Sequence, residues 1–243
     1  AAFGSHSDAD HCYNTPRAWY MLRTLSPNNF MGTPEDDDLP WCMVPDKKIT
    51  VEDVKYVLSA YYQGTPYNPY AKHGDASLRG MYRPIGINRN NFLAVTQLRP
   101  YAKKELMAIE WLAVGSNAFN ELVPFYSNVT TTPAYLANTT GDATTEDFYW
   151  SNRLVAVMAD AHYSSCIAHI ERYQQKLMSF GHGQIIKTDK AFETEKPENV
   201  QAFLEKANCE TAAETKKQTT DLLNKVLQSA SLEMKNGFSR ADA

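Results

Sequence analysis

The stretch FLAVTQLRPYAKKELMAIEWLAV, residues 92–114, decides the fold class of this chain. Its two apolar runs, residues 92–98 and 106–114, have the length and the pattern of strands. Arg99-Pro100 ends the first run, because proline cannot donate to a ladder of backbone hydrogen bonds. The stretch therefore predicts neighbouring strands and a sheet.

The segments on either side extend the predicted sheet. Residues 83–88, the polar turn 89–91 and the run 92–98 predict a β-hairpin, and residues 120–129 predict a further strand. Short connections between successive strands favour an antiparallel meander with one face packed on helices. The expected class is α+β.

Two helices are expected before the sheet. Asn14-Thr15-Pro16 combines a capping residue with a proline in the first turn, and it predicts a helix to about residue 24. Thr50-Val51-Glu52-Asp53 is similar to a capping box and predicts a helix over residues 50–62.

Helices are also expected after the sheet. Thr144-Thr145-Glu146-Asp147 predicts the start of a long helix that reaches about residue 180, where Gly181-His182-Gly183 ends it. Residues 197–235 are rich in helix formers and predict a helical tail with a C-cap at Asn236-Gly237. The polar segment 188–196 is the only visible boundary.

Composition excludes several classes of function. The chain has 243 residues and a net charge of −4, and its 24 basic residues form no stripe, which argues against a nucleic-acid partner. No window approaches the roughly 20 apolar residues of a membrane span, so we expect a soluble chain that does not contact the membrane. Four cysteines without a CxxC pair predict reduced thiols in a cytoplasmic protein.

Histidines and cysteines suggest two weaker sites. Cys12 next to His11 is compatible with a thiol enzyme, but a loop or strand-edge thiol is the favoured interpretation, because catalytic cysteine and histidine meet in space from distant positions. The group His6, Asp8, Asp10 and His11 fits no familiar metal site, and His162 and His169 share one helix face without a carboxylate nearby. We predict no metal and no cofactor.

Arginines surround the predicted hairpin and are the more informative residues. A guanidinium held at a strand end can bind a carboxylate through two hydrogen bonds, as recognition of a peptide terminus requires. Solvated surface charges are the alternative, and the pattern alone does not decide between them. The arginines are Arg79, Arg83, Arg89 and Arg99.

Long runs of this sequence resemble the N-terminal-cysteine dipeptidases of the dipeptidase A type, which are related to penicillin V acylase and bile salt hydrolase. They are YQGTPYNPY at 62–70, RPIGINRN at 83–90, WLAVGSNAFN at 111–120 and MKNGFSR at 234–240. The resemblance covers essentially the whole chain and corresponds to the C-terminal half of that family.

The resemblance implies half of an Ntn-hydrolase αββα sandwich, with residues 1–187 in that domain and residues 188–243 as a helical tail. It also implies hydrolysis of dipeptides by an N-terminal cysteine, without a metal. Position 1 is alanine here, and residues 1–5 have neither a start methionine nor the pattern of a signal peptide, so we expect the sequence to begin inside a longer protein, where an upstream targeting signal would not be visible. We therefore expect a nucleophile outside this chain, a missing N-terminal half as partner, and an inactive chain without it.

The same resemblance assigns roles to five residues. Asn14 is expected to donate its amide to the oxyanion or the substrate, and Arg83 to orient the nucleophile or the substrate carboxylate. Gly64, Tyr67 and Asn117 are expected to line the pocket, with turn geometry and packing as the alternative. A non-catalytic binding module, a self-sufficient thiol enzyme at Cys12 and a homo-oligomer stay open.

Overall fold

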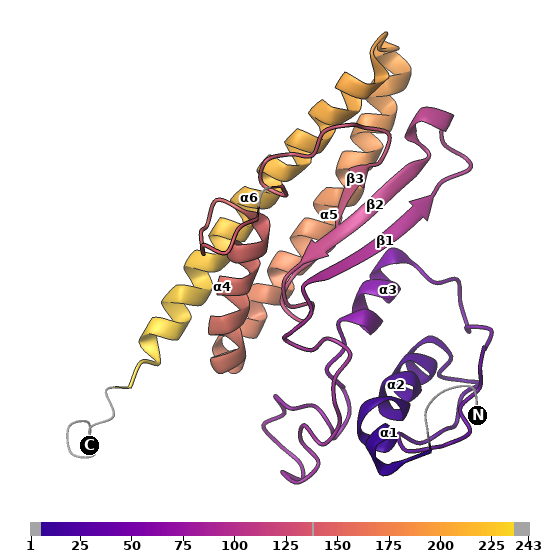
Figure 1. The fold of residues 1–243 in the computed structure, drawn as a ribbon, viewed down its shortest axis with the longest axis vertical. Coiled ribbons are helices and arrows are strands. Elements are labelled where there is room, and N and C mark those ends of the chain that lie inside the picture. Colours follow the sequence, from indigo (N-terminus) through magenta and orange to yellow (C-terminus); the bar gives the residue numbers. More distant parts are fainter. Residues whose placement is uncertain (1–5, 138, 236–243) are drawn as a thin grey trace. The chain divides into compact units, whose positions relative to one another are not determined.

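The computed structural model describes residues 6–137 and 139–235. The chain forms two compact units, residues 1–90 and 91–243, which are described separately below. Figure 1 traces their helices and strands in chain order. The mixture of helices with an antiparallel sheet confirms the predicted α+β class. The predicted C-cap at 236–237 lies outside the described residues.

The first unit contains three short helices and an aromatic core. Helices α1 (Asp8–Tyr13), α2 (Thr15–Leu25) and α3 (Val51–Leu58) are joined by long loops. Tyrosine and tryptophan rings pack edge to face in this core, an arrangement that aromatic quadrupoles favour. The buried core residues are Trp19, Tyr20, Phe30, Ala60, Tyr62 and Tyr82.

Local sequence explains where α2 and α3 begin. Thr50 and Asp53 form the predicted capping box, in which the Asp53 N–H donates to the Thr50 hydroxyl and the Thr50 N–H donates to the Asp53 carboxylate. Pro16 lies in the first turn of α2, as predicted, but the Asn14 side chain makes no capping hydrogen bond. The short helix α1 before it was not predicted.

The prediction of a strand at residues 83–88 is wrong. The backbone there bonds to helix α1 and to the loop after α3, since the Arg83 N–H donates to the Cys12 carbonyl and the Gly86 N–H to the Ala60 carbonyl. A β-carbon on Gly86 would lie 2.1 Å from the Ser59 carbonyl oxygen, so only glycine permits this approach. The segment is therefore an ordered loop and forms no hairpin.

The second unit contains the sheet, with strands β1 (Phe92–Leu98), β2 (Ala108–Val114) and β3 (Val123–Tyr126) in the order β1-β2-β3. All pairs are antiparallel, and the short 3-10 helix η1 (Lys104–Leu106) lies between β1 and β2. Leu93 pairs with Ala113 and Trp111 with Pro124 on the buried face. The runs 92–98 and 106–114 thus predicted two strands correctly, and they pair with each other.

Three helices cover the sheet. Helix α4 (Phe148–Ala161) packs on β2, whereas α5 (Tyr163–Glu195) and α6 (Val200–Leu232) pack on β3 and run side by side in Figure 1. The predicted helix from 144 to 180 is therefore two helices, which meet at His162. The predicted helical tail is confirmed as α6.

The predicted helix stop at Gly181-His182-Gly183 is wrong, because α5 continues to Glu195. A β-carbon on Gly181 would lie 2.7 Å from Pro124 Cδ, so this glycine serves close packing of α5 on the sheet. The polar segment 188–196, predicted as a boundary, is helical through residue 195, and α5 is followed by its C-cap Lys196 in a left-handed conformation. Whether residues 188–243 form a separate tail stays a prediction.

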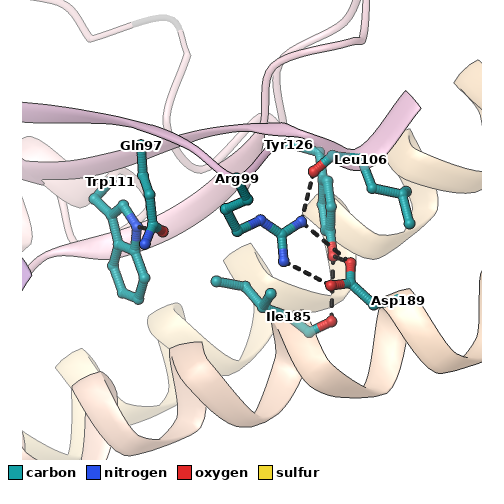
Figure 2. A network of polar contacts seen from close by, with 7 residues as sticks. All are labelled: Gln97, Arg99, Leu106, Trp111, Tyr126, Ile185 and Asp189. Atoms are coloured by element: carbon teal, nitrogen blue, oxygen red, sulfur yellow. Dashed lines mark hydrogen bonds and ion pairs between the residues drawn. The ribbon is translucent and has the colours of Figure 1, made fainter. Parts of the chain in front are cut away.

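Buried polar contacts fix α5 and α6 to the sheet. Figure 2 shows Arg99 and Tyr126 donating to the Asp189 carboxylate of α5, and Arg99 also donating to the Leu106 carbonyl. Asn208 of α6 pairs with the Tyr126 backbone, with Tyr126 N to Asn208 Oδ1 at 2.9 Å and Asn208 Nδ2 to Tyr126 O at 3.0 Å. Both contacts satisfy groups that would otherwise be buried without partners.

Candidate functional site

Two hydrogen bonds to other parts of the first unit fix the backbone of Arg83. Its N–H donates to the Cys12 carbonyl at 3.0 Å, and its carbonyl accepts from the Tyr62 hydroxyl at 2.8 Å. Tyr62 is buried, which raises the pKa of its hydroxyl well above the usual range, while the positive charge of Arg17 works against this shift. The hydroxyl therefore stays protonated and can donate to Arg83.

The Arg83 side chain has capacity to bind a ligand. Its guanidinium carbon lies 5.2 Å from the centre of the Tyr13 ring, within the range of a cation–π contact. The buried Nε has no hydrogen-bond acceptor in the described part of the chain. A buried donor without a partner costs about 1–3 kcal/mol, and a carboxylate is the kind of group that can accept from it.

Asn14 lies at the junction of α1 and α2, directly after Tyr13. Its Nδ2 donates to the Asp10 carboxylate, and its Oδ1 accepts from Arg17 Nη2 at 2.7 Å. These contacts orient the amide and leave the second N–H of Nδ2 for another acceptor. Because Arg83 contacts both Cys12 and Tyr13, the fold brings Arg83 to the segment that carries Asn14.

Gly64 and Tyr67 belong to the same unit but have structural roles there. Gly64 has φ +75°, and a β-carbon on it would meet nothing within 4 Å, so backbone conformation explains this glycine. The Tyr67 ring packs 4.6 Å from the Tyr82 ring and 6.1 Å from the Trp19 ring. Pocket lining by either residue stays a prediction.

Asn117 lies in the second unit, in the loop after β2. It is buried, and its Oδ1 lies 3.4 Å from the Asn120 Nδ2 that donates to the Val114 carbonyl. Its contacts therefore stabilise the end of β2. A role of Asn117 in the pocket also stays a prediction.

Among the described residues His11 contacts an acidic side chain, and no hydrogen bond joins it to the neighbouring Cys12 thiol, so a catalytic pair of the two stays a prediction. His11 Nε2 lies 2.9 Å from Asp37 Oδ1, and His6 Nδ1 lies 3.3 Å from the same oxygen. The hydrogen bond and charge of Asp37 raise the pKa of His11, and the hydrogen bond from His11 lowers the pKa of Asp37. The His11 imidazole therefore serves an ion pair, and Cys12 is an exposed thiol.

Other histidines likewise contact ordinary partners. His162 Nδ1 lies 2.6 Å from Glu233 Oε2, whereas His169 lies half-buried between α5 and α6. Within residues 6–137 and 139–235, no three histidine, cysteine or acidic side chains are placed to hold a metal ion. In the same residues, no helix has the length and apolarity to cross a membrane.

The sequence alone did not reveal three residues of this site. Tyr13, Arg17 and Asp10 surround Asn14 and Arg83, and each contacts one of them through the turn between α1 and α2. The spacing in the sequence hinted at two of these contacts, because Asp10 and Arg17 lie four and three positions from Asn14 and such residues are neighbours on a helix. The separate helix α1 had to be known before this rule could be applied.

The sequence of this chain is similar to that of known proteins. The model of Peptidase family C69 matches residues 1–176. A protein named "Dipeptidase" from Bifidobacterium longum is 43% identical to this chain. The alignment has 286 positions, gaps included, and covers 99% of this chain and 54% of that protein. A "Probable dipeptidase A" from Streptococcus pyogenes is 43% identical over 99% of this chain and 50% of its own length.

A third relative extends the comparison. A "Probable dipeptidase B" from Lactococcus lactis is 37% identical over 99% of this chain and 50% of its own length. The chain thus spans about half the length of these curated relatives, while nearly all of its own sequence is matched.

Proposed function

The chain belongs to peptidase family C69, and from this premise we propose that it is the C-terminal half of a cysteine dipeptidase. In this proposal it binds the dipeptide and the oxyanion, and a segment outside it carries the nucleophilic thiol. The observation that carries the proposal is the Arg83 guanidinium beside Tyr13, whose buried Nε finds no acceptor among the residues that the structure describes. The dipeptidase names of the relatives support the substrate class.

Arg83 is proposed to bind the C-terminal carboxylate of a dipeptide. A guanidinium presents parallel N–H donors that match the two oxygens of a carboxylate. Its backbone is clamped between the Cys12 carbonyl and the Tyr62 hydroxyl, so little freedom is lost when a ligand binds. A free carboxylate distinguishes a dipeptide from an internal segment of a longer chain.

Asn14 is proposed to donate its second Nδ2 hydrogen to the carbonyl oxygen under attack. Asp10 and Arg17 hold the amide in one orientation, as a preorganised oxyanion donor requires. Loss of one such donor lowers kcat by about 10²–10³-fold in a hydrolase of known mechanism.

The proposed reaction uses a thiol outside this chain. Its sulfur attacks the peptide carbonyl carbon, and the α-amino group of the same cysteine takes the thiol proton and gives it to the leaving amine as the C–N bond breaks. Water then hydrolyses the thioester and returns the proton to the sulfur.

The sheet supports a missing partner segment. In the described residues β1 is an edge strand, and its outer edge has no strand partner. Phe92 and Leu98 are 60% and 66% exposed, whereas Leu93 on the opposite face is buried. Native proteins cover exposed apolar edge strands, and a second sheet from the other half of an αββα sandwich fits this face.

Mixing halves tests the proposal. We expect the chain to be inactive alone and to hydrolyse dipeptides when co-expressed with the N-terminal half of the Bifidobacterium longum relative. Activity of the chain alone that is lost in Cys12→Ala would instead support a self-sufficient thiol enzyme. If the two halves assemble but the complex hydrolyses no dipeptide, the result would support a non-catalytic binding module.

Variants of the active mixture test Arg83 itself. Arg83→Gln is expected to raise KM at least tenfold for dipeptides and to abolish their preference over C-terminally amidated dipeptides. Arg89→Gln is the matched control, because Arg89 is exposed and lies in the same loop region. An unchanged preference in Arg83→Gln would contradict carboxylate binding by this residue.

A further inference from the structure

A groove runs between helices α5 and α6, away from the site around Arg83. Two adjoining hollows of about 410 and about 570 Å³ share three lining residues, Arg172, Lys176 and Gln218. Along α5, His169, Arg172, Tyr173 and Lys176 follow the spacing of one helix face. The groove is therefore formed by the facing sides of two regular helices.

The groove is positively charged although the whole chain has a net charge of −4. Four cationic side chains line it together with two carboxylates, and both carboxylates are engaged by lysines of α6 itself: Lys217 with Glu214 at 3.5 Å and Lys225 with Asp221 at 2.5 Å. Arg172 and Lys176 of α5 form no ion pair with any described residue. Two cations thus remain for a ligand.

The floor of the groove offers apolar surface and one hydrogen-bond acceptor. Tyr173 and Leu222 are buried there, and the Tyr173 hydroxyl is fixed by a hydrogen bond of 3.0 Å to the Thr219 hydroxyl. Gln218 donates its Nε2 to Glu214, so its Oε1 faces away from that carboxylate; the Oε1 is buried and lacks a donor within the described residues. An unfilled buried acceptor costs free energy that a ligand hydroxyl recovers.

We infer that this groove binds a small organic dianion that carries phosphate or carboxylate groups. Arg172 and Lys176 contact its charges, and its carbon skeleton lies on Tyr173 and Leu222. Arginine binds phosphate and carboxylate through two parallel hydrogen bonds, and lysine adds a point charge. The hollow is large enough for a small metabolite, since ligand pockets have volumes of about 300–1,000 Å³.

The inference is independent of the proposed dipeptidase activity. Helix α6 lies wholly beyond residues 1–176, the part matched by the family model. Ligand binding is measured directly on the full chain, so its failure leaves the proposal about Arg83 untouched.

Calorimetric titration at low ionic strength tests the site, because salt screens exposed charges. The probes are glycerol 3-phosphate and malate, two organic dianions that each carry a hydroxyl group, and they separate phosphate from carboxylate as the preferred group. We expect saturable binding of one probe molecule per chain. The double variant Arg172→Gln and Lys176→Gln should weaken binding at least tenfold.

The matched control removes two positive charges from the same helices outside the groove. Lys190 of α5 and Lys206 of α6 are exposed, and Lys190→Gln with Lys206→Gln should change affinity less than threefold. Equal weakening in both double variants, or no saturable binding of either probe, would overturn the inference. If the first double variant loses helical circular dichroism, Arg172→Lys replaces it, with several-fold weaker binding expected because lysine lacks the two-point contact.

Discussion

Arg99 and Asp189 form a two-point ion pair between the end of the first strand and helix α5. The distances are 2.6 Å from Nη1 to Oδ2 and 3.2 Å from Nη2 to Oδ1. Arg99 is only 4% exposed, and Tyr126 donates to the same carboxylate at 2.8 Å. Arg99 was predicted as one of four arginines able to bind a carboxylate, and it binds one of this chain's own.

Removal of one partner of this ion pair should destabilise the second unit. Asp189→Ala leaves the Arg99 guanidinium buried without its counter-charge, which costs about 3–5 kcal/mol for a fully buried pair. Because Asp189 is partly exposed, we expect the free energy of unfolding to fall by about 3 kcal/mol, the lower end of this range. Urea unfolding followed by circular dichroism measures the difference.

The exposed pair of Lys187 and Glu210 on the same helices serves as the control. Lys187→Ala should cost at most about 1 kcal/mol, as for surface ion pairs generally. A similar loss in Asp189→Ala and Lys187→Ala would show that burial does not govern the Arg99 contact.

Two glycines of α5, two residues apart and therefore on different faces of the helix, should respond to alanine in opposite directions. Gly181→Ala places a methyl group 2.7 Å from Pro124 Cδ and 3.3 Å from Trp111 Cζ3, and overpacking of this kind costs about 1–3 kcal/mol. At Gly183 a methyl group meets nothing within 4 Å, so Gly183→Ala should stabilise the helix by about 0.5–1 kcal/mol.

Thermal unfolding of both variants measures this contrast. Stabilisation by Gly181→Ala would mean that α5 does not approach the sheet as closely as described.

The ion pairs of Asp37 should make the stability of the first unit depend on pH. The raised pKa of His11 stabilises the fold below the ordinary histidine value of 6.5, and this contribution is lost as pH rises through the raised pKa. The lowered pKa of Asp37 stabilises it above the ordinary value of 3.8, and this contribution is lost as pH falls through the lowered pKa. Both contributions to stability are therefore fully present between pH 3.8 and pH 6.5.

The variant Asp37→Asn checks this origin. NMR titration should show that the pKa of His11 falls toward its ordinary value in Asp37→Asn, and that unfolding becomes less dependent on pH between 5.5 and 8, a range of about two units around the histidine titration. A His11 pKa that stays raised in this variant would assign the shift to Glu35 or Asp8, the other carboxylates that act on it.

Local sequence rules predicted the elements whose determinants lie within them. The capping box at Thr50, the proline at the start of α2 and the strand-like runs 92–98 and 106–114 each depend on neighbours within a few residues. The segment 83–88 has the same strand-like pattern but forms a loop. Its hydrogen bonds go to Cys12 and Ala60, far away in the sequence, and no local pattern contains that information.

For the candidate site, family resemblance singled out Asn14 and Arg83, and the first unit places both next to Tyr13. The surrounding contacts from Asp10, Arg17 and Tyr62 came only from the fold. Gly64 and Tyr67 show why the sequence cannot identify pocket residues by itself. A glycine in a turn and a tyrosine packed in a core look the same in the sequence as residues that line a pocket.

By itself the amino-acid sequence determined the α+β class, the position of three strands and the helical character of both long C-terminal segments. The tertiary structure decided that Gly181 continues a helix and that Arg99 forms an ion pair with Asp189. It also decided that, within the described part of the chain, the buried Arg83 Nε has no acceptor. The physical reason is that strand and helix periodicity are local properties of the chain. Close packing and the pairing of buried charges depend on residues that only folding brings together.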